Sequence, residues 1–137
     1  MQPSPEIEAI IRDWFAAVAN ADPSWLDRHL STDAKLRIIG TDPAEWLQGK
    51  QAQELLHADL AALGGNASFF VQQSEGYAEG DIGWGAAAFT ITLPNELQIS
   101  PRWSAVFHRE DGQWKAVQIH ASVGVTNEQL FGMPFDM

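Results

Sequence analysis

The stretch HREDGQWKAVQIHASVGVTNEQ, residues 108–129, contains the clearest structural signal in this chain. A charged turn, EDG at 110–112, precedes a run in which apolar and polar residues alternate, as they do in a strand with one buried face. The apolar set of this run is Val117, Ile119, Ala121 and Val123, and the polar set is Gln118, His120 and Ser122. We expect the apolar set to face the core, which leaves His120 and Ser122 on the outer face of the sheet.

The segment before the turn, PRWSAVFH at 101–108, predicts the preceding strand of a hairpin. The EDG sequence suits a three-residue loop with Gly112 in the bulge position. That register predicts one wholly apolar face, made by Trp103, Ala105, Phe107, Ile119 and Ala121. Trp114 then falls on the opposite, outer face of the hairpin.

The rest of the chain predicts helices first and mainly strands afterwards. Apolar residues recur at spacings of three and four over two long segments, and a cap-plus-proline signal starts a short helix between them. The predicted helices cover 4–22, 23–31 and 51–63, and the predicted strands cover 34–40, 67–80, 82–93, 96–108 and 113–125. Three helices and an antiparallel meander make an α+β fold, and 137 residues predict a single domain over 1–137.

Composition excludes several classes of function. The chain has no cysteine, so it has no disulfide, thiol nucleophile or thiolate metal site. Eight Lys and Arg stand against 18 Asp and Glu, giving a formal net charge of −10, which disfavours nucleic acid and anionic membranes as partners. The four histidines lack metal-ligand spacing, so we expect no metal and no cofactor. With no signal-like or membrane-spanning segment, we expect a cytoplasmic protein.

Two segments carry a family resemblance: HREDGQWKAVQIHAS at 108–122 and LSTDAKLRI at 30–38. On these the chain resembles the nuclear transport factor 2-like superfamily, which includes ketosteroid isomerases, SnoaL-like cyclases and the association domain of calcium/calmodulin-dependent kinase. The resemblance implies a cystatin-like roll, in which a cone-shaped, curved antiparallel sheet wraps around three helices and encloses a cavity. It also implies pairing of two copies through the outer face of the sheet, as in many members.

The resemblance also allows a residue-by-residue test of the pocket. The positions of the isomerase base and tyrosine correspond to Ile38 and Trp14, and the third catalytic position falls near Ser104, so the isomerase groups are replaced. Positions that hold arginines in the kinase domain correspond to alanines here. We therefore expect a largely apolar, aromatic pocket; the alternative is a core in which the same side chains fill all the space. Its predicted lining is Trp14, Ile38, Trp84, Ala88, Trp103, Ala105, Phe107, Ile119 and Ala121.

Three functions are compatible with such a domain. The first is binding of a small hydrophobic molecule; the second is an isomerase, cyclase or dehydratase acting on one, with no catalytic residue identifiable. The third is a dimerisation or sensory module. An ionisable group inside the cavity would favour the enzyme, and a filled cone would favour the module. We further predict a homodimer through the outer sheet face, with His120 and Ser122 at the interface and an apolar patch that includes Trp114, Phe89 and Ile91.

Overall fold

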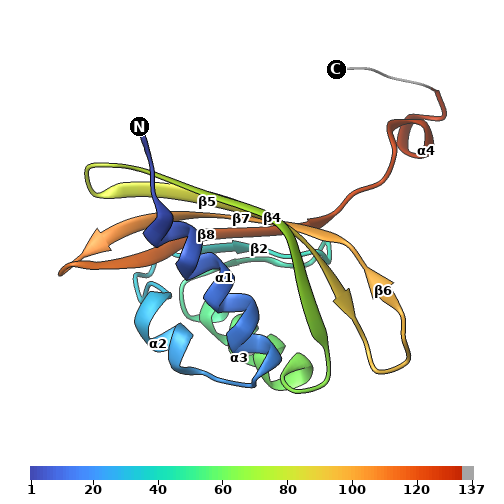
Figure 1. The fold of residues 1–137 in the computed structure, drawn as a ribbon, viewed down its shortest axis with the longest axis horizontal. Helices are drawn as coiled ribbons and strands as arrows, with labels where there is room; N and C mark the ends of the chain where they lie inside the picture. Colours follow the sequence, from blue (N-terminus) through green and yellow to red (C-terminus); the bar gives the residue numbers. More distant parts are fainter. Residues whose placement is uncertain (134–137) are drawn as a thin grey trace.

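The computed structural model describes residues 1–133 and has two layers, a curled, unclosed sheet and the helices that cover one of its faces (Figure 1). The helices are α1 (Pro5–Ala19), α2 (Ser24–His29), α3 (Lys50–Leu63) and α4 (Asn127–Phe131). The first three lie under the sheet, whereas α4 extends away from it. Within the described part of the chain, no helix has the length and apolar character that crossing a membrane requires.

The sheet has eight strands and confirms the predicted α+β class. The strands are β1 (Gln2–Pro3), β2 (Arg37–Ile39), β3 (Trp46–Gln48), β4 (Ser68–Glu79), β5 (Ile82–Thr92), β6 (Gln98–Ile99), β7 (Pro101–Glu110) and β8 (Gln113–Val123). They are ordered β1-β4-β5-β7-β8-β2-β3, with β6 paired to β5. All pairings between these strands are antiparallel except that of β2 with β8, which is parallel and was not expected.

Local sequence explains the longest helix. The side-chain oxygen of Ser4 accepts a hydrogen bond from the Ile7 N–H at 3.2 Å, and Pro5 occupies the first helical position. The backbone N–H of Ser4 also donates to the Gly76 carbonyl at 2.7 Å, which ties the start of α1 to β4. The buried face of α1 is Ile7, Ile10, Ile11, Trp14, Phe15, Ala17 and Val18.

The β7–β8 hairpin differs from the predicted one in two features that offset each other. Glu110 pairs with Gln113, so the turn has two residues, and Asp111 and Gly112 both have positive φ, at 52° and 79°. Val117 is then an extra residue without a partner, which makes a bulge in β8. Beyond the bulge the facing is as predicted, with Trp103 opposite Ala121 and Ala105 opposite Ile119.

Before the bulge the facing of β8 is the reverse of the predicted one. Trp114 is buried at 1% exposure, so its placement on the outer face is wrong. Its carbonyl oxygen accepts a hydrogen bond from the Nδ1–H of His29 at 3.0 Å, and His29 is buried. Burial lowers the pKa of His29 below its ordinary 6.5, which favours the neutral ring.

Strand β5 also faces the opposite way from the prediction. Trp84 and Ala88 lie on the outer face, whereas Ala87 and Phe89 are buried beneath the sheet. The reason is the pair of glycines on the inner side: a Cβ at Gly83 or Gly85 would collide with the side chains of α1. Trp84 instead stacks on Tyr77 of the outer face, with ring centroids 4.8 Å apart.

The close approach of α1 to β5 gives a test of this packing. A Cβ at Gly85 would lie 2.6 Å from the Glu75 carbonyl oxygen and would collide with Ile11, so Gly85→Ala should destabilise the fold by about 2 kcal/mol. Gly124→Ala is the matched control, because its nearest neighbours are Arg102 side-chain atoms at 3.6 Å. Urea unfolding measures both variants, and equal stabilities would contradict the described packing.

Candidate functional site

An interior cavity of ≈240 Å³ lies between helices α1 and α3 and the inner face of the sheet. Its lining side chains are mainly apolar and come from segments distant in the sequence. They include Trp14, Phe15, Val18, Ile38, Leu55, Leu56, Leu63, Phe69, Phe89, Ile91, Trp103, Ile119 and Ala121. Gly40, Thr41, Glu45 and Asp59 add a polar section, and Ile39 and Pro101 complete the lining.

Aromatic contacts hold the apolar wall of the cavity in place. Phe15 lies 4.3 Å from Phe89 and 6.2 Å from Phe69 between ring centroids, and it meets Trp103 edge-on at 5.9 Å. Trp14 packs on Trp25, with centroids 4.8 Å apart, and the indole N–H of Trp25 donates to the Ile10 carbonyl at 2.9 Å. Rings packed in this way fix the shape of the wall.

One hydrogen-bond donor is available in this wall. Trp14 is only 6% exposed, and its indole N–H donates to no residue in the described part of the chain. Within residues 1–133, no fully buried side-chain nitrogen or oxygen lacks a partner, so this N–H must reach open space. Since Trp14 also lines the interior cavity, its N–H is a candidate donor to an acceptor atom of a bound molecule.

Two carboxyl groups form the polar section of the cavity. Asp59 projects from α3, and Glu45 precedes β3, where its Oε1 accepts the Asp42 N–H at 3.0 Å. Burial, and then the nearby charge of Glu45, raise the pKa of Asp59 from 3.8 to about 6. Asp59 is therefore a half-buried carboxyl that titrates close to neutral pH inside an apolar cavity.

The sequence prediction missed Asp59, although its signal was present. The apolar face of α3 includes Leu55, Leu56, Leu60 and Leu63. Asp59 follows Leu55 by four residues and Leu56 by three, so helical geometry places it on that same face. When a carboxyl residue shares a helix face with apolar residues, the sequence indicates a titratable side chain that points toward the interior.

Five of the nine predicted lining residues lie at this cavity. They are Trp14, Ile38, Trp103, Ile119 and Ala121. Ala105 and Phe107 face the same side but are buried in the core without lining the cavity. Trp84 and Ala88 are on the other face of the sheet, for the reason given above.

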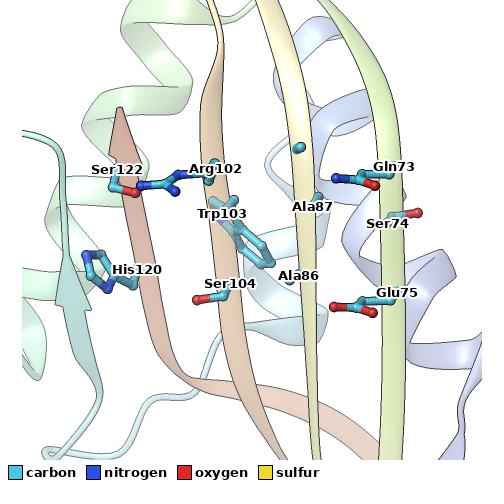
Figure 2. A pocket seen from close by; sticks show the side chains of 11 residues that line it. Gln73, Ser74, Glu75, Ala86, Ala87, Arg102, Trp103, Ser104, His120 and Ser122 are labelled. Atoms are coloured by element: carbon cyan, nitrogen blue, oxygen red, sulfur yellow. The ribbon is translucent and has the colours of Figure 1, made fainter. Parts of the chain in front are cut away.

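A second, shallower hollow of ≈430 Å³ lies on the outer face of the sheet (Figure 2). Two rows of paired residues cross it from β4 to β8. The first row is Glu75, Ala86, Ser104 and His120, and the second is Gln73, Ala88, Arg102 and Ser122. An acid thus stands at the β4 end of the hollow and a histidine at the β8 end, with alanines and a serine between them. His120 and Ser122 lie on the outer face, as their alternation predicted.

No arrangement of catalytic or metal-ligating groups accompanies this outer hollow. His120 and Ser122 have no hydrogen bond to an orienting acid among residues 1–133. In the same part of the chain, no group of three or more His, Asp or Glu side chains could hold a metal ion. The hollow is a polar surface in which the first row has small central side chains, Ala86 and Ser104, whereas the second row has Arg102 beside Ala88.

Comparison with known proteins agrees with this architecture. A family model described as SnoaL-like domain matches residues 7–126. The chain belongs to the SnoaL-like domain family. No curated protein matches it.

Solved structures similar to this SnoaL-like domain confirm the nuclear transport factor 2-like fold. An NTF2-like protein of unknown function from Pseudomonas putida KT2440 is 20% identical, with 90% of this chain and 88% of that chain covered and a TM-score of 0.75. A putative calcium/calmodulin-dependent protein kinase II association domain from Xanthomonas campestris is 20% identical, with coverages of 87% and 86% and a TM-score of 0.67. A putative ketosteroid isomerase from Shewanella frigidimarina NCIMB 400 is 17% identical, with coverages of 83% and 92% and a TM-score of 0.68.

The raised pKa of Asp59 predicts a pH-dependent effect on stability. The folded state holds the Asp59 proton more tightly than the unfolded chain does, so Asp59 lowers the stability of the fold increasingly as pH rises from 3.8 to about 6. Asp59→Asn should therefore be more stable than wild type at pH 8. Because solvent screens this half-buried group, we expect the free energy of unfolding of Asp59→Asn to exceed that of wild type by about 1 kcal/mol.

Thermal or urea unfolding across pH 4 to 8 measures the difference. The difference in stability between Asp59→Asn and wild type should decrease as pH falls below about 6. Asp81→Asn, in the exposed β4–β5 turn, removes the same charge outside the cavity and should show no such dependence. An advantage that is equal at pH 4 and pH 8 would contradict a titrating Asp59.

Proposed function

We propose that the interior cavity binds a small, largely apolar molecule. The observation that carries this proposal is the aromatic wall around ≈240 Å³ of space, in a core that is otherwise closely packed. The volume suits a molecule of one ring or a short chain. The Trp14 N–H and the Asp59 carboxyl provide one donor and one acceptor that could orient it.

A second candidate function, proton transfer on the bound molecule, is favoured by Asp59. A carboxyl with a pKa of about 6 in an apolar cavity has the properties of a general base. The group lies on α3, whereas the isomerase base position predicted from the resemblance corresponds to Ile38. An isomerase-type reaction in this cavity would therefore use a base from a different element.

Cyclohexanone is a suitable probe because it is small, neutral and mostly apolar, and it has a carbonyl group. Amide and indole NMR shifts should reveal binding at the cavity, and Ala121→Leu should weaken it at least tenfold by filling the space. Ala61→Leu, on the exposed side of α3, is the control and should bind as wild type does. Equal binding by both variants would place the probe elsewhere.

The same samples in D₂O distinguish a binding protein from an enzyme. Exchange of the hydrogens next to the carbonyl faster than in buffer, and loss of that acceleration in Asp59→Asn, would support proton transfer. Binding with exchange at the buffer rate would support a binding protein.

The outer hollow suggests a second copy of the chain as a partner. The predicted reason for this interface was wrong, because Trp114 and Phe89 are buried in the core and Ile91 lines the interior cavity. A different reason supports it. Among the described helices, α1 to α3 cover only the inner face, so the outer face is open (Figure 1).

Two outer faces would be complementary, with a carboxylate acceptor opposite an imidazole, if they packed with a two-fold axis parallel to the strands, between β5 and β7. Glu75 would then lie opposite His120 of the second copy, and Ala86 would lie opposite Ser104. The small central residues would let the two sheets approach. The similarity to association domains is consistent with an oligomer of this kind.

Sedimentation equilibrium at neutral pH and micromolar concentration should show a dimer. Glu75→Lys should weaken it roughly tenfold, because it places lysine opposite His120. Adding His120→Glu to Glu75→Lys should restore the association by reversing the pair. Glu54→Lys, on the exposed side of α3, changes the net charge equally and should leave the dimer intact. A wild-type monomer, or no rescue in the double variant, would contradict this interface.

A further inference from the structure

We propose that the molecule bound in the interior cavity carries a protonated amine, which the carboxylates of Asp59 and Glu45 hold. This inference rests on the proposed binding function and adds the chemical class of the ligand. It follows from the charges that line the cavity, from the partners these charges lack, and from the aromatic wall beside them.

Among residues 1–133, the two carboxyl groups have no cation to pair with. No Lys, Arg or His side chain from the described residues lines the cavity. The ion pairs of residues 1–133 involve Glu79, Glu8 and Glu110, and neither Asp59 nor Glu45 takes part in one. The cavity therefore has negative charge that remains unbalanced in the absence of a ligand.

An ammonium group would remove both causes of the raised Asp59 pKa. The first cause is loss of solvent around the carboxylate, and the second is repulsion from Glu45. A positive charge between the two groups would replace the missing solvent interactions and screen the repulsion. Anionic molecules would add a third negative charge at the same place, so the cavity should reject carboxylates and phosphates.

The rest of the lining suits the remainder of such a molecule. Phe15, Phe69, Phe89, Trp14 and Trp103 offer five aromatic rings for an apolar body. Aromatic rings also attract a nearby cation, so they do not oppose an ammonium group as an aliphatic wall would. An apolar amine thus matches both sections of the cavity, whereas a purely apolar molecule matches only one.

Three probes of nearly the same size and different charge test this inference: benzylamine, benzyl alcohol and benzoate. At pH 8, NMR titration of the full chain should show benzylamine binding at least tenfold more tightly than benzyl alcohol, with benzoate weakest. Asp59→Asn should remove most of the benzylamine preference, so that benzylamine and benzyl alcohol bind with similar affinities. Glu45→Gln should reduce the benzylamine preference in part. Asp81→Asn, which removes a charge outside the cavity, should preserve it.

The outcomes separate this inference from the function on which it rests. If benzyl alcohol binds and benzylamine binds no more tightly, the amine inference is overturned and the apolar-ligand proposal stands. The amine inference also fails if benzylamine keeps its advantage in Asp59→Asn, since its charge would then be recognised elsewhere. If none of the three probes nor cyclohexanone shifts a cavity resonance, the binding function itself is overturned.

Discussion

The close contact between the start of α1 and the glycines of β4 and β5 determines the geometry of this domain. Gly76, Gly83 and Gly85 let the backbone and the isoleucines of α1 reach the sheet at distances that a Cβ would prevent. Further along, Phe15 meets Phe89 and Trp103, whose rings hold the helix away from the sheet. The helix is therefore inclined to the sheet (Figure 1), and the cavity occupies the wider end.

This inclination also decides which polar groups meet the cavity. The wider end is closed by α3 and by the segment before β3, and these bring Asp59 and Glu45 to the aromatic wall. The hollow on the opposite face of the sheet shows a different chemistry, because most of its lining side chains are small or polar and helices α1 to α3 lie on the other side (Figure 1). One sheet thus separates an apolar compartment with two acids from a polar surface with one acid and two basic groups.

The sequence predicted the fold class, helices α1 to α3 and the facing of β8 beyond residue 117, because those depend on strong hydropathy contrasts. Helix α4 and the short strands β1 and β3 were not predicted. The prediction failed where the two faces of a strand differ little in hydropathy, or where one extra residue changes which side chains share a face. In β5 the predicted facing came from the resemblance, which put Ala88 at a cavity position with Trp84 on the same side. Packing against α1 instead requires the glycines on the inner side. Trp114 was misplaced because the Val117 bulge has no sequence signature. Asp59 was missed because the buried face of its helix was defined from the apolar residues alone, although Asp59 lies among these leucines.

The parallel pairing of β2 with β8 joins parts of the chain that are synthesised far apart in time. Helices α1 to α3 are synthesised before the four long strands that cover their apolar faces. Strand β2 is also synthesised before β8, so it can form its parallel pairing only after β8 has been made. The nascent helices therefore expose Trp14, Phe15 and the leucines of α3 to the cellular milieu until the sheet is complete. The wall of the cavity requires Ile38 from β2 and Ile119 from β8 together, so the cavity is complete only once these strands have paired. A molecule that bound there would stabilise only chains that have already completed the sheet.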